Sequence, residues 1–499
     1  MTVEASLVSE TTRRDADALG SCVQPKFVPT SIWTEAMLAA LQRGVKGGKW
    51  HSLIDKVSRL ETLEMGWAQV ERNAGAAGVD RMSVQRFAQA ADRYLGELAQ
   101  GLRDRSYRPQ PVRRVYIPKG KGQRPLGIPA VKDRVVQAAL KLVIEPIFEH
   151  EFEPRSFGFR PGLGCKGALR EVDRHLKSGH YWVVDADLQS YFDTIPHSSL
   201  LAKVGKRIAD GQVLELVQRF LKQDIMEDLK RWTPISGSPQ GAVVSPLLAN
   251  IYLHELDVEM REAGLVMVRY ADDAVVLCRS REEAEAALAR LRAWVNANGL
   301  TLHPDKTHVG DCRVAGQGFE FLGYRFEAGK RTVRKKSLMS LRDKIRAKTK
   351  RNGGQSIGYV IASLNPMLKG WFAYFKHAHR FTFSSIDGFV RRRLRSMLRK
   401  QQHRPGQGRC RHDHQQWPNA FFAELGLFTM SEALALARQS RCGNNRLESP
   451  SRENCTAGSE GGDGDAVPYP YPRSTSRRWF RKPRLMALGR IQPCVPKRY

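Results

Sequence analysis

Runs of apolar residues separated by short polar turns divide most of this chain into predicted helices and strands. Apolar positions three and four residues apart predict helices over residues 34–41, 51–69 and 83–98, then a strand over 112–117 and a buried helix over 243–256. The capping box SREE at 280–283 predicts a further helix that stops at Gly299. The order of these elements predicts a small antiparallel sheet backed by helices.

Two adjacent acids interrupt one of the most apolar stretches of the chain. Asp272 and Asp273 lie between two β-forming runs in VMVRYADDAVVL, residues 266–277, so we expect them at the tip of a hairpin. Neighbouring carboxylates repel each other and require a cation or a basic partner, and hard oxygen ligands suit magnesium. Taken alone, such a pair is more often an ordinary acidic turn between two strands.

A third acid changes this interpretation. Asp187 lies in another strand-like run, YWVVDADL at residues 181–188. If this strand lies beside the hairpin, Asp187 and Asp272 meet at one end of a sheet. That arrangement suits phosphoryl transfer with two metal ions about 4 Å apart, in which one ion activates the attacking hydroxyl and the other stabilises the departing oxygen. The three acids together therefore predict nucleotidyl transfer.

Further segments rich in glycine, proline and aromatic residues surround the acids in a definite order. They are NAGAAGVD at 73–80, IPKGKGQRPLGIP at 117–129, SFGFRPG at 156–162, SPQGAVVSP at 238–246, PDKT at 304–307 and FLGY at 321–324. In this order they resemble the motifs of reverse transcriptases encoded by bacterial group II introns. The resemblance implies an α+β fold: a right-hand polymerase with fingers and a palm, an antiparallel sheet backed by helices, followed by an α-helical thumb or maturase domain.

The resemblance also implies roles for particular residues. Asp187, Asp272 and Asp273 would be the catalytic ligands of two Mg²⁺ ions, or of Mn²⁺ in their place. The implied nucleotide-binding residues are Lys119 and Arg124 at the triphosphate, Phe192 under the sugar, Gln240 near a template base or the nucleotide, and Lys306 at the leaving pyrophosphate. The implied primer-binding residues are Phe321, Leu322 and Gly323. From the residues alone, each set has an ordinary alternative: a hairpin tip, a core aromatic, a turn-capping amide or a surface lysine.

The charge of the chain points independently to a polyanionic partner. Lys and Arg number 81 and Asp and Glu 51, which gives a formal net charge of +30. Each phosphate that Lys or Arg neutralises releases a counterion, so nucleic acid is the expected partner, with a membrane surface as the alternative. No run is long enough to span a bilayer, so we expect a cytoplasmic protein without a membrane partner. The resemblance names the partners as group II intron RNA, an RNA template with a DNA primer, deoxynucleoside triphosphates and target DNA.

Beyond residue 330 the pattern becomes helical and strongly basic. Cations interleaved with aromatic residues suit RNA, because bases stack on rings while cations pair with phosphates. By resemblance to the maturase domain, the predicted RNA-binding residues are Lys369, Arg391, Arg392, Arg393 and Arg395. Among Trp371, Phe372 and Phe375, helical spacing assigns at least two to the core. The Cys and His residues between 410 and 442 are spaced too irregularly for a zinc site and favour a basic loop.

These observations predict four regions. They are a flexible arm at 1–27, fingers and palm at 28–330, a helical thumb or maturase domain at 331–448, and a disordered basic tail at 449–499 without a recognisable endonuclease. The predicted function is an RNA-directed DNA polymerase of a group II intron that also assists splicing and mobility. The alternatives are a splicing factor without polymerase activity and a retron or other defence-type reverse transcriptase, which would lack the maturase-like thumb.

Overall fold

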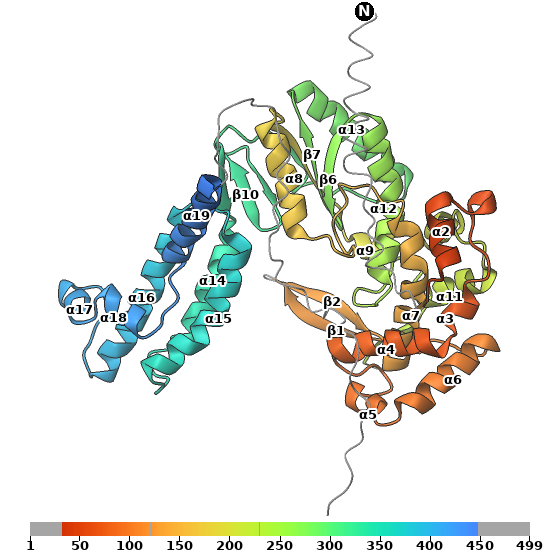
Figure 1. Cartoon of the computed structure of the whole chain (residues 1–499), viewed down its shortest axis with the longest axis horizontal. Helices are drawn as coiled ribbons and strands as arrows, with labels where there is room; N and C mark the ends of the chain where they lie inside the picture. Colours follow the sequence, from red (N-terminus) through yellow and green to blue (C-terminus); the bar gives the residue numbers. More distant parts are fainter. Residues whose placement is uncertain (1–31, 120–121, 229, 448–499) are drawn as a thin grey trace, which may run out of the picture. The chain divides into compact units, whose positions relative to one another are not determined.

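The computed structural model describes residues 32–119, 122–228 and 230–447 (Figure 1). The predicted arm at 1–27 and the predicted tail at 449–499 lie outside the described residues. The described part mixes helices with three small sheets, which confirms the predicted α+β class. Within it, no helix is both long enough and apolar enough to cross a membrane.

Helices form the first part of the described chain, and two predicted helices are interrupted. Residues 51–69 form α3 and most of α4, and residues 83–98 form α5 and part of α6. Arg59 (ψ 139°) and Ala90 (φ −139°) leave the helical backbone region, which apolar spacing does not reveal. The bounds are α2 (Glu35–Arg43), a 3₁₀ turn η2 (Lys46–Gly48), α3 (Ile54–Val57), α4 (Leu60–Asn73), α5 (Val84–Ala88), α6 (Ala91–Arg103) and α7 (Val131–Glu149).

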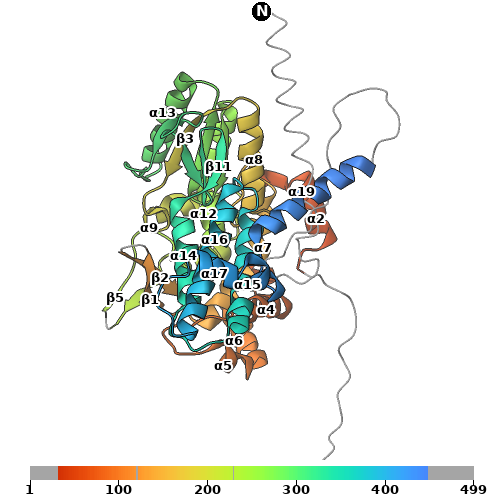
Figure 2. The same ribbon diagram turned by 90° about the vertical axis from the view of Figure 1, so that its left-hand side faces the viewer.

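A four-stranded sheet in the order β2-β1-β4-β5 joins two distant parts of the sequence (Figure 2). The long hairpin of β1 (Val112–Lys119) and β2 (Gly122–Ile128) is antiparallel, and β1 also pairs in parallel with β4 (Ile225–Glu227). The last strand is β5 (Lys230–Trp232). Between β1 and β4 in the sequence lie α7 and one of the four strands of the central sheet, so this pairing is a tertiary contact.

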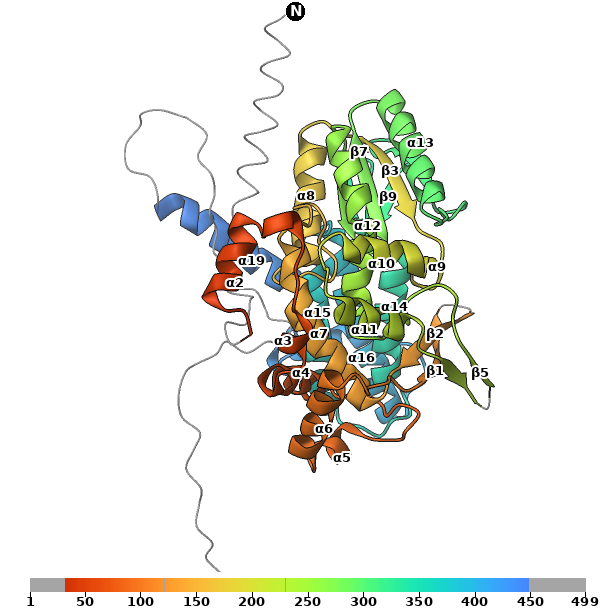
Figure 3. The same ribbon diagram turned by 90° about the vertical axis from the view of Figure 1, so that its right-hand side faces the viewer.

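The central sheet has the order β6-β7-β3-β8, and every neighbouring pair is antiparallel. Its two faces pack on different elements because side chains alternate along each strand. Val184 and Val276 face the core formed with α12 and α13, whereas Val183 and Val275 face the core that includes α8. Figure 3 shows α8 and α13 on opposite sides of this sheet. The bounds are α8 (Cys165–Lys177), β3 (Trp182–Asp187), α9 (Tyr191–Thr194), α10 (His197–Gly205), α11 (Gly211–Leu221), α12 (Ser245–Glu262), β6 (Val266–Tyr270), β7 (Asp273–Cys278), α13 (Arg281–Ala297) and β8 (His308–Asp311).

The predicted cap of α13 forms with one difference. The Ser280 hydroxyl accepts a hydrogen bond from the Glu283 backbone N–H at 3.2 Å. The Glu283 carboxylate accepts from the Arg279 backbone N–H at 2.7 Å, one residue before the expected donor. At the other end, Gly299 has φ +68°, the left-handed conformation that ends helices and that glycine adopts without strain.

A third sheet leads into the C-terminal helices. The helical segment was predicted to begin after residue 330, but residues Lys330–Val333 form strand β11. The first helix of this part therefore starts at Lys335. Helices α14, α15 and α16 lie side by side (Figure 1). The bounds are β9 (Phe319–Phe321), β10 (Tyr324–Glu327), β11 (Lys330–Val333), α14 (Lys335–Lys348), α15 (Ile357–Phe375), α16 (Phe381–Gln401), α17 (Arg411–Gln416), α18 (Asn419–Glu424) and α19 (Met430–Leu447).

Candidate active site

The two adjacent acids lie at a tight turn between β6 and β7, as the apolar pattern predicts. Tyr270 and Asp273 are register partners, so Ala271 and Asp272 alone form the connection. Ala271 has φ +61°, a left-handed conformation that is unfavourable for a residue with a side chain. The surrounding structure therefore has to stabilise this turn.

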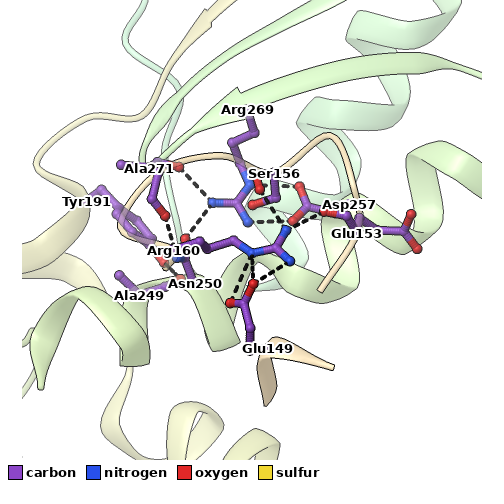
Figure 4. A network of polar contacts seen from close by, with 11 residues as sticks. Glu149, Glu153, Ser156, Arg160, Tyr191, Ala249, Asn250, Asp257, Arg269 and Ala271 are labelled. Atoms are coloured by element: carbon purple, nitrogen blue, oxygen red, sulfur yellow. Dashed lines mark hydrogen bonds and ion pairs between the residues drawn. The ribbon is translucent and has the colours of Figure 1, made fainter. Parts of the chain in front are cut away.

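The guanidinium of Arg269 holds the turn from inside the protein (Figure 4). It donates through Nη1 to the carbonyl oxygen of Ala271 at 2.8 Å and to Oδ1 of Asn250 at 3.1 Å, and through Nε to Oδ1 of Asp257 at 2.7 Å. Arg269 is 1% exposed, and its ion pair with Asp257 is equally buried. A buried guanidinium with these partners fixes the backbone on which Asp272 and Asp273 depend.

The SFGFRPG segment packs directly against the same turn. Phe157 donates its backbone N–H to Arg269 O at 2.8 Å, and Asn250 donates its side-chain amide to Gly158 O at 2.7 Å. A Cβ added to Gly158 would lie 2.1 Å from the backbone nitrogen of Ala271, so only glycine fits there. Arg160 ties the far side of the segment to Glu149 with a 2.8 Å ion pair.

Three carboxylates share the face of the central sheet that ends at this turn. Asp187 of β3 is the register partner of Asp273 of β7, so the two side chains point to the same face. Asp185 lies two residues before Asp187 on the same strand and therefore on the same face. Asp272 lies in the turn itself, immediately before Asp273. The predicted meeting of the β3 strand with the hairpin thus occurs.

Burial and the proximity of these carboxylates raise the pKa of two of them, Asp273 and Asp185. Burial and then the negative charges of Asp185, Asp272 and Asp187 raise the pKa of Asp273 to about 7, with Arg334 acting in the opposite direction. Burial, with a further contribution from Asp187, raises the pKa of Asp185 to about 6. Lys306 donates from Nζ to Oδ2 of Asp187 at 2.9 Å. Negative charge gathered in this way marks a place where a cation is stabilised.

The donor chemistry of this site fits a divalent cation. Its ligands would be carboxylate oxygens, which hard cations prefer, and the raised pKa of Asp273 comes in part from repulsion that a cation relieves. Among the described residues, no three His, Cys, Asp or Glu side chains already stand as a closed metal-binding group. Lys306 contacts Oδ2 of Asp187 and would compete with an ion that binds the same oxygen.

Sequence reasoning missed two residues of this site. Asp185 was recognisable, because it shares the alternating strand face of Asp187. Arg269 was harder to recognise. An arginine within an apolar strand is rarely buried without a paired acid, which predicts a partner. The sequence does not show which acid this is, because Asp257 lies in a different element. Lys306 lies in the turn that precedes β8.

The structure brings together two of the predicted nucleotide-binding residues. Arg124 of β2 donates from Nε to Oε1 of Gln240 at 2.6 Å. The turn that carries Gln240 is joined to β2 by a 2.7 Å hydrogen bond from Gly127 N to Gln240 O. Phe192 is buried against Tyr191 and Phe159. The side chain of Lys119 lies outside the described part of the chain.

The predicted primer-binding residues lie where β9 meets β10: Phe321 ends β9, and Leu322 and Gly323 form the turn. Leu322 and Gly323 have φ +49° and +82°, and the phenol of Tyr374 in α15 donates to Leu322 O at 2.8 Å. Phe321 is fully buried, so its ring belongs to the core, which was the ordinary alternative. The backbone N–H of Glu320 donates to Oδ2 of Asp185 at 3.4 Å, which connects this sheet to the acidic face.

The predicted RNA-binding cations differ in accessibility. Lys369 is exposed and Arg391, Arg392 and Arg393 are half-buried. Arg393 also donates from Nε to Oγ1 of Thr349 at 3.0 Å and from Nη2 to Thr349 O at 2.6 Å, so only part of its guanidinium is open to a ligand. Arg395 is 2% exposed and donates to Trp417 O and to Oδ1 of Asn419, both at 2.9 Å. The prediction that Arg395 contacts RNA is therefore wrong, because its guanidinium is used inside the protein.

Two family models and several relatives match the chain. The models are the reverse transcriptase (RNA-dependent DNA polymerase) family over residues 117–326 and the group II intron maturase-specific domain over residues 338–417. Protein YkfC of Escherichia coli is 35% identical over 295 residues, which cover 50% of this chain and 75% of YkfC. The chain belongs to the group II intron reverse transcriptase and maturase family.

A further relative matches a smaller part of this chain, and one solved structure matches a larger part. The group II intron-encoded protein LtrA of Lactococcus lactis is 43% identical over 165 residues, which span 33% of this chain and 27% of LtrA. Among solved structures, the telomerase of Candida albicans matches 62% of this chain and 63% of its own at 11% identity, with a TM-score of 0.36. That score is too low to support a conclusion about this member of the family.

Replacing Arg269 by Met should separate the stability of the fold from the placement of the turn. We expect Arg269→Met to lower the free energy of unfolding by about 3–5 kcal/mol, because Asp257 is left buried and unpaired. Arg269→Met/Asp257→Leu should recover much of that stability without restoring the hydrogen bond to Ala271. Urea unfolding measures the stability of both variants, with Arg290→Met as a control at an exposed position. If Arg269→Met were as stable as this control, Arg269 would not have this stabilising role.

Proposed function

We propose that this chain is an RNA-directed DNA polymerase of a group II intron and that it also binds the intron RNA to assist splicing and mobility. The observation that carries the proposal is the placement of Asp187 opposite Asp273, with Asp272 in the adjoining turn. Membership of the group II intron reverse transcriptase and maturase family supports the same function. The hydrogen-bonded pair of Arg124 and Gln240 also supports the proposal, because Arg124 contributes a positive charge from the sheet that contains β2.

The proposed reaction is attack of a primer 3′ hydroxyl on the α-phosphate of a deoxynucleoside triphosphate, with release of pyrophosphate. Asp187, Asp272 and Asp273 would hold two divalent ions, Mg²⁺ or Mn²⁺, which when bound supply electrophilic assistance. Arg124, and Lys119 with it, would offset negative charge on the leaving group. Lys306 would give up its contact with Asp187 and hold a proton for the departing pyrophosphate. Phe192 would support the sugar and exclude a 2′ hydroxyl.

The proposed RNA-binding surface is centred on Phe389 of α16. The guanidiniums of Arg392, Arg346 and Arg342 lie 5.2, 5.5 and 5.9 Å from the centre of its ring. Burial and the positive charges of Arg409, Arg346 and Arg342 lower the pKa of Arg392. Cations gathered at this density repel one another, so a phosphate backbone would stabilise them. Together with Lys369, Arg391 and Arg393, they are the proposed contacts to intron RNA.

The two alternatives receive less support. A splicing factor without polymerase activity has no need for the cluster of carboxylates, yet Asp185, Asp187, Asp272 and Asp273 are all present. A retron or defence-type enzyme would lack the maturase-specific segment, which here matches residues 338–417. Target DNA remains a proposed partner on family grounds alone.

Asp272→Asn should abolish polymerisation while the chain stays folded. Removing one ligand from a site that supplies several kcal/mol of transition-state stabilisation should slow incorporation by at least about 10³-fold. Extension of a DNA primer on an RNA template with magnesium measures this, beside wild type and Asp92→Asn, which removes an exposed acid of α6. Equal extension by wild type and Asp272→Asn would end the catalytic assignment.

Binding of Mg²⁺ should release a proton near neutral pH. Since the pKa of Asp273 is raised to about 7, this group is mostly protonated at pH 6 and mostly ionised at pH 8. A cation favours the ionised form, so affinity should be about tenfold weaker at pH 6 than at pH 8. Titration calorimetry in buffers of different ionisation enthalpy counts the proton. Asp273→Asn should lose much of this dependence, whereas a proton count unchanged in that variant would contradict the assignment.

Arg392→Gln should weaken RNA binding without weakening the fold. Loss of one phosphate contact reduces the salt dependence of log affinity by about one unit of slope, while relief of like-charge repulsion leaves the unfolding free energy unchanged or higher. Intron RNA binding at several salt concentrations, splicing of precursor RNA and thermal unfolding test this together. Arg290→Gln is the control. A variant that binds RNA normally but unfolds more easily would assign Arg392 a structural role.

A further inference from the structure

The amide of Gln240 is contacted at both ends by groups of opposite charge. Its Oε1 accepts from Nε of Arg124 at 2.6 Å, and its Nε2 donates to Oδ2 of Asp193 at 3.3 Å. If the amide were turned over, its oxygen would face the carboxylate and its NH₂ would face the guanidinium. The two neighbours therefore select one orientation of the amide.

Asp193 is placed for this contact by its backbone, independently of its carboxylate. It lies in α9, and its carbonyl oxygen accepts from the Ser236 hydroxyl at 3.2 Å. The neighbouring Phe192 O accepts from Ser238 N at 2.7 Å. Gly237, at φ +88°, approaches so closely that an added Cβ would lie 2.8 Å from Asp193 O. The segment that carries Gln240 thus stays attached to α9 when the carboxylate is changed.

The carboxylate itself is exposed to solvent, so it contributes little to folding. It lies within electrostatic reach of both Arg114 and Arg124. Among the described residues, Gln240 is the only hydrogen-bond partner of Arg124, and it uses Nε alone. The Nη1 and Nη2 groups of Arg124 remain available for an anion, which a guanidinium binds with two parallel hydrogen bonds.

We propose that Asp193 is a positioning residue of the nucleotide site: it fixes the amide of Gln240, which holds Arg124 by Nε and leaves its two Nη groups directed to the triphosphate. This inference rests on the proposed polymerase function. When template, primer and nucleotide exclude water, the chain of contacts strengthens, because electrostatic interactions are stronger at lower dielectric. Asp193 therefore acts on nucleotide binding without touching the nucleotide.

Single-nucleotide incorporation on a defined RNA template and DNA primer tests the proposal. In Asp193→Ala we expect KM for the deoxynucleotide to rise about tenfold, equal to about 1.4 kcal/mol, with a much smaller change in kcat and an unchanged melting temperature. In Asp193→Asn the side-chain oxygen can still accept from Gln240, but its NH₂ can also satisfy the reversed amide. Its KM should therefore lie between those of wild type and Asp193→Ala. Asp92→Ala is the control for loss of an exposed acid.

A double variant separates action through Arg124 from an independent role. If Asp193 acts through Arg124, Arg124→Ala/Asp193→Ala should bind nucleotide no more weakly than Arg124→Ala alone. Additive losses, or a normal KM in Asp193→Ala, would overturn the inference while wild-type polymerisation leaves the proposed function standing. A wild-type chain that incorporates no nucleotide would instead overturn the proposed function and the inference together.

Discussion

The buried guanidinium of Arg269 is the interaction on which the rest of the site depends. The acids have to project from a two-residue connection, and that connection places Ala271 in an unfavourable left-handed conformation. Arg269 offsets the strain with a hydrogen bond to Ala271 O, and Asp257 keeps the guanidinium charged and fixed. Asn250 and the 156–162 segment pack around the same turn.

Rigidity of this turn has an electrostatic consequence. Because Asp187, Asp185 and Asp273 are held on one face of the sheet, they cannot separate to relieve their repulsion. Burial is the main cause of the raised pKa of Asp273, and the fixed arrangement of the neighbouring carboxylates raises it further. Lys306 compensates part of the charge at Asp187 in the chain as described. A divalent cation would compensate more of it, which connects the fold to the proposed chemistry.

Cations are used in two contrasting ways in this chain. Some arginines donate their hydrogen bonds to carbonyl and carboxylate oxygens of the protein and so stabilise its fold, as Arg269, Arg395 and Arg160 do. Arg342, Arg346 and Arg392 instead gather around one aromatic ring, where Arg346 alone of the three has an ion pair among the described residues, with Asp343 at 2.5 Å. Only the second kind of site gains from a polyanion, since the first is already satisfied. The large positive charge of the sequence does not distinguish the two.

The sequence by itself determined the fold class, the strands that carry the acids and the turn between them, because strand periodicity and local turn preferences act over a few residues. It also determined the capped start of α13. The tertiary structure alone decided that Asp257 pairs with Arg269, that Asp193 reaches Gln240, and that Arg395 and Phe321 are buried. Each of these depends on which distant elements become neighbours, and residue spacing along a chain carries no direct record of that.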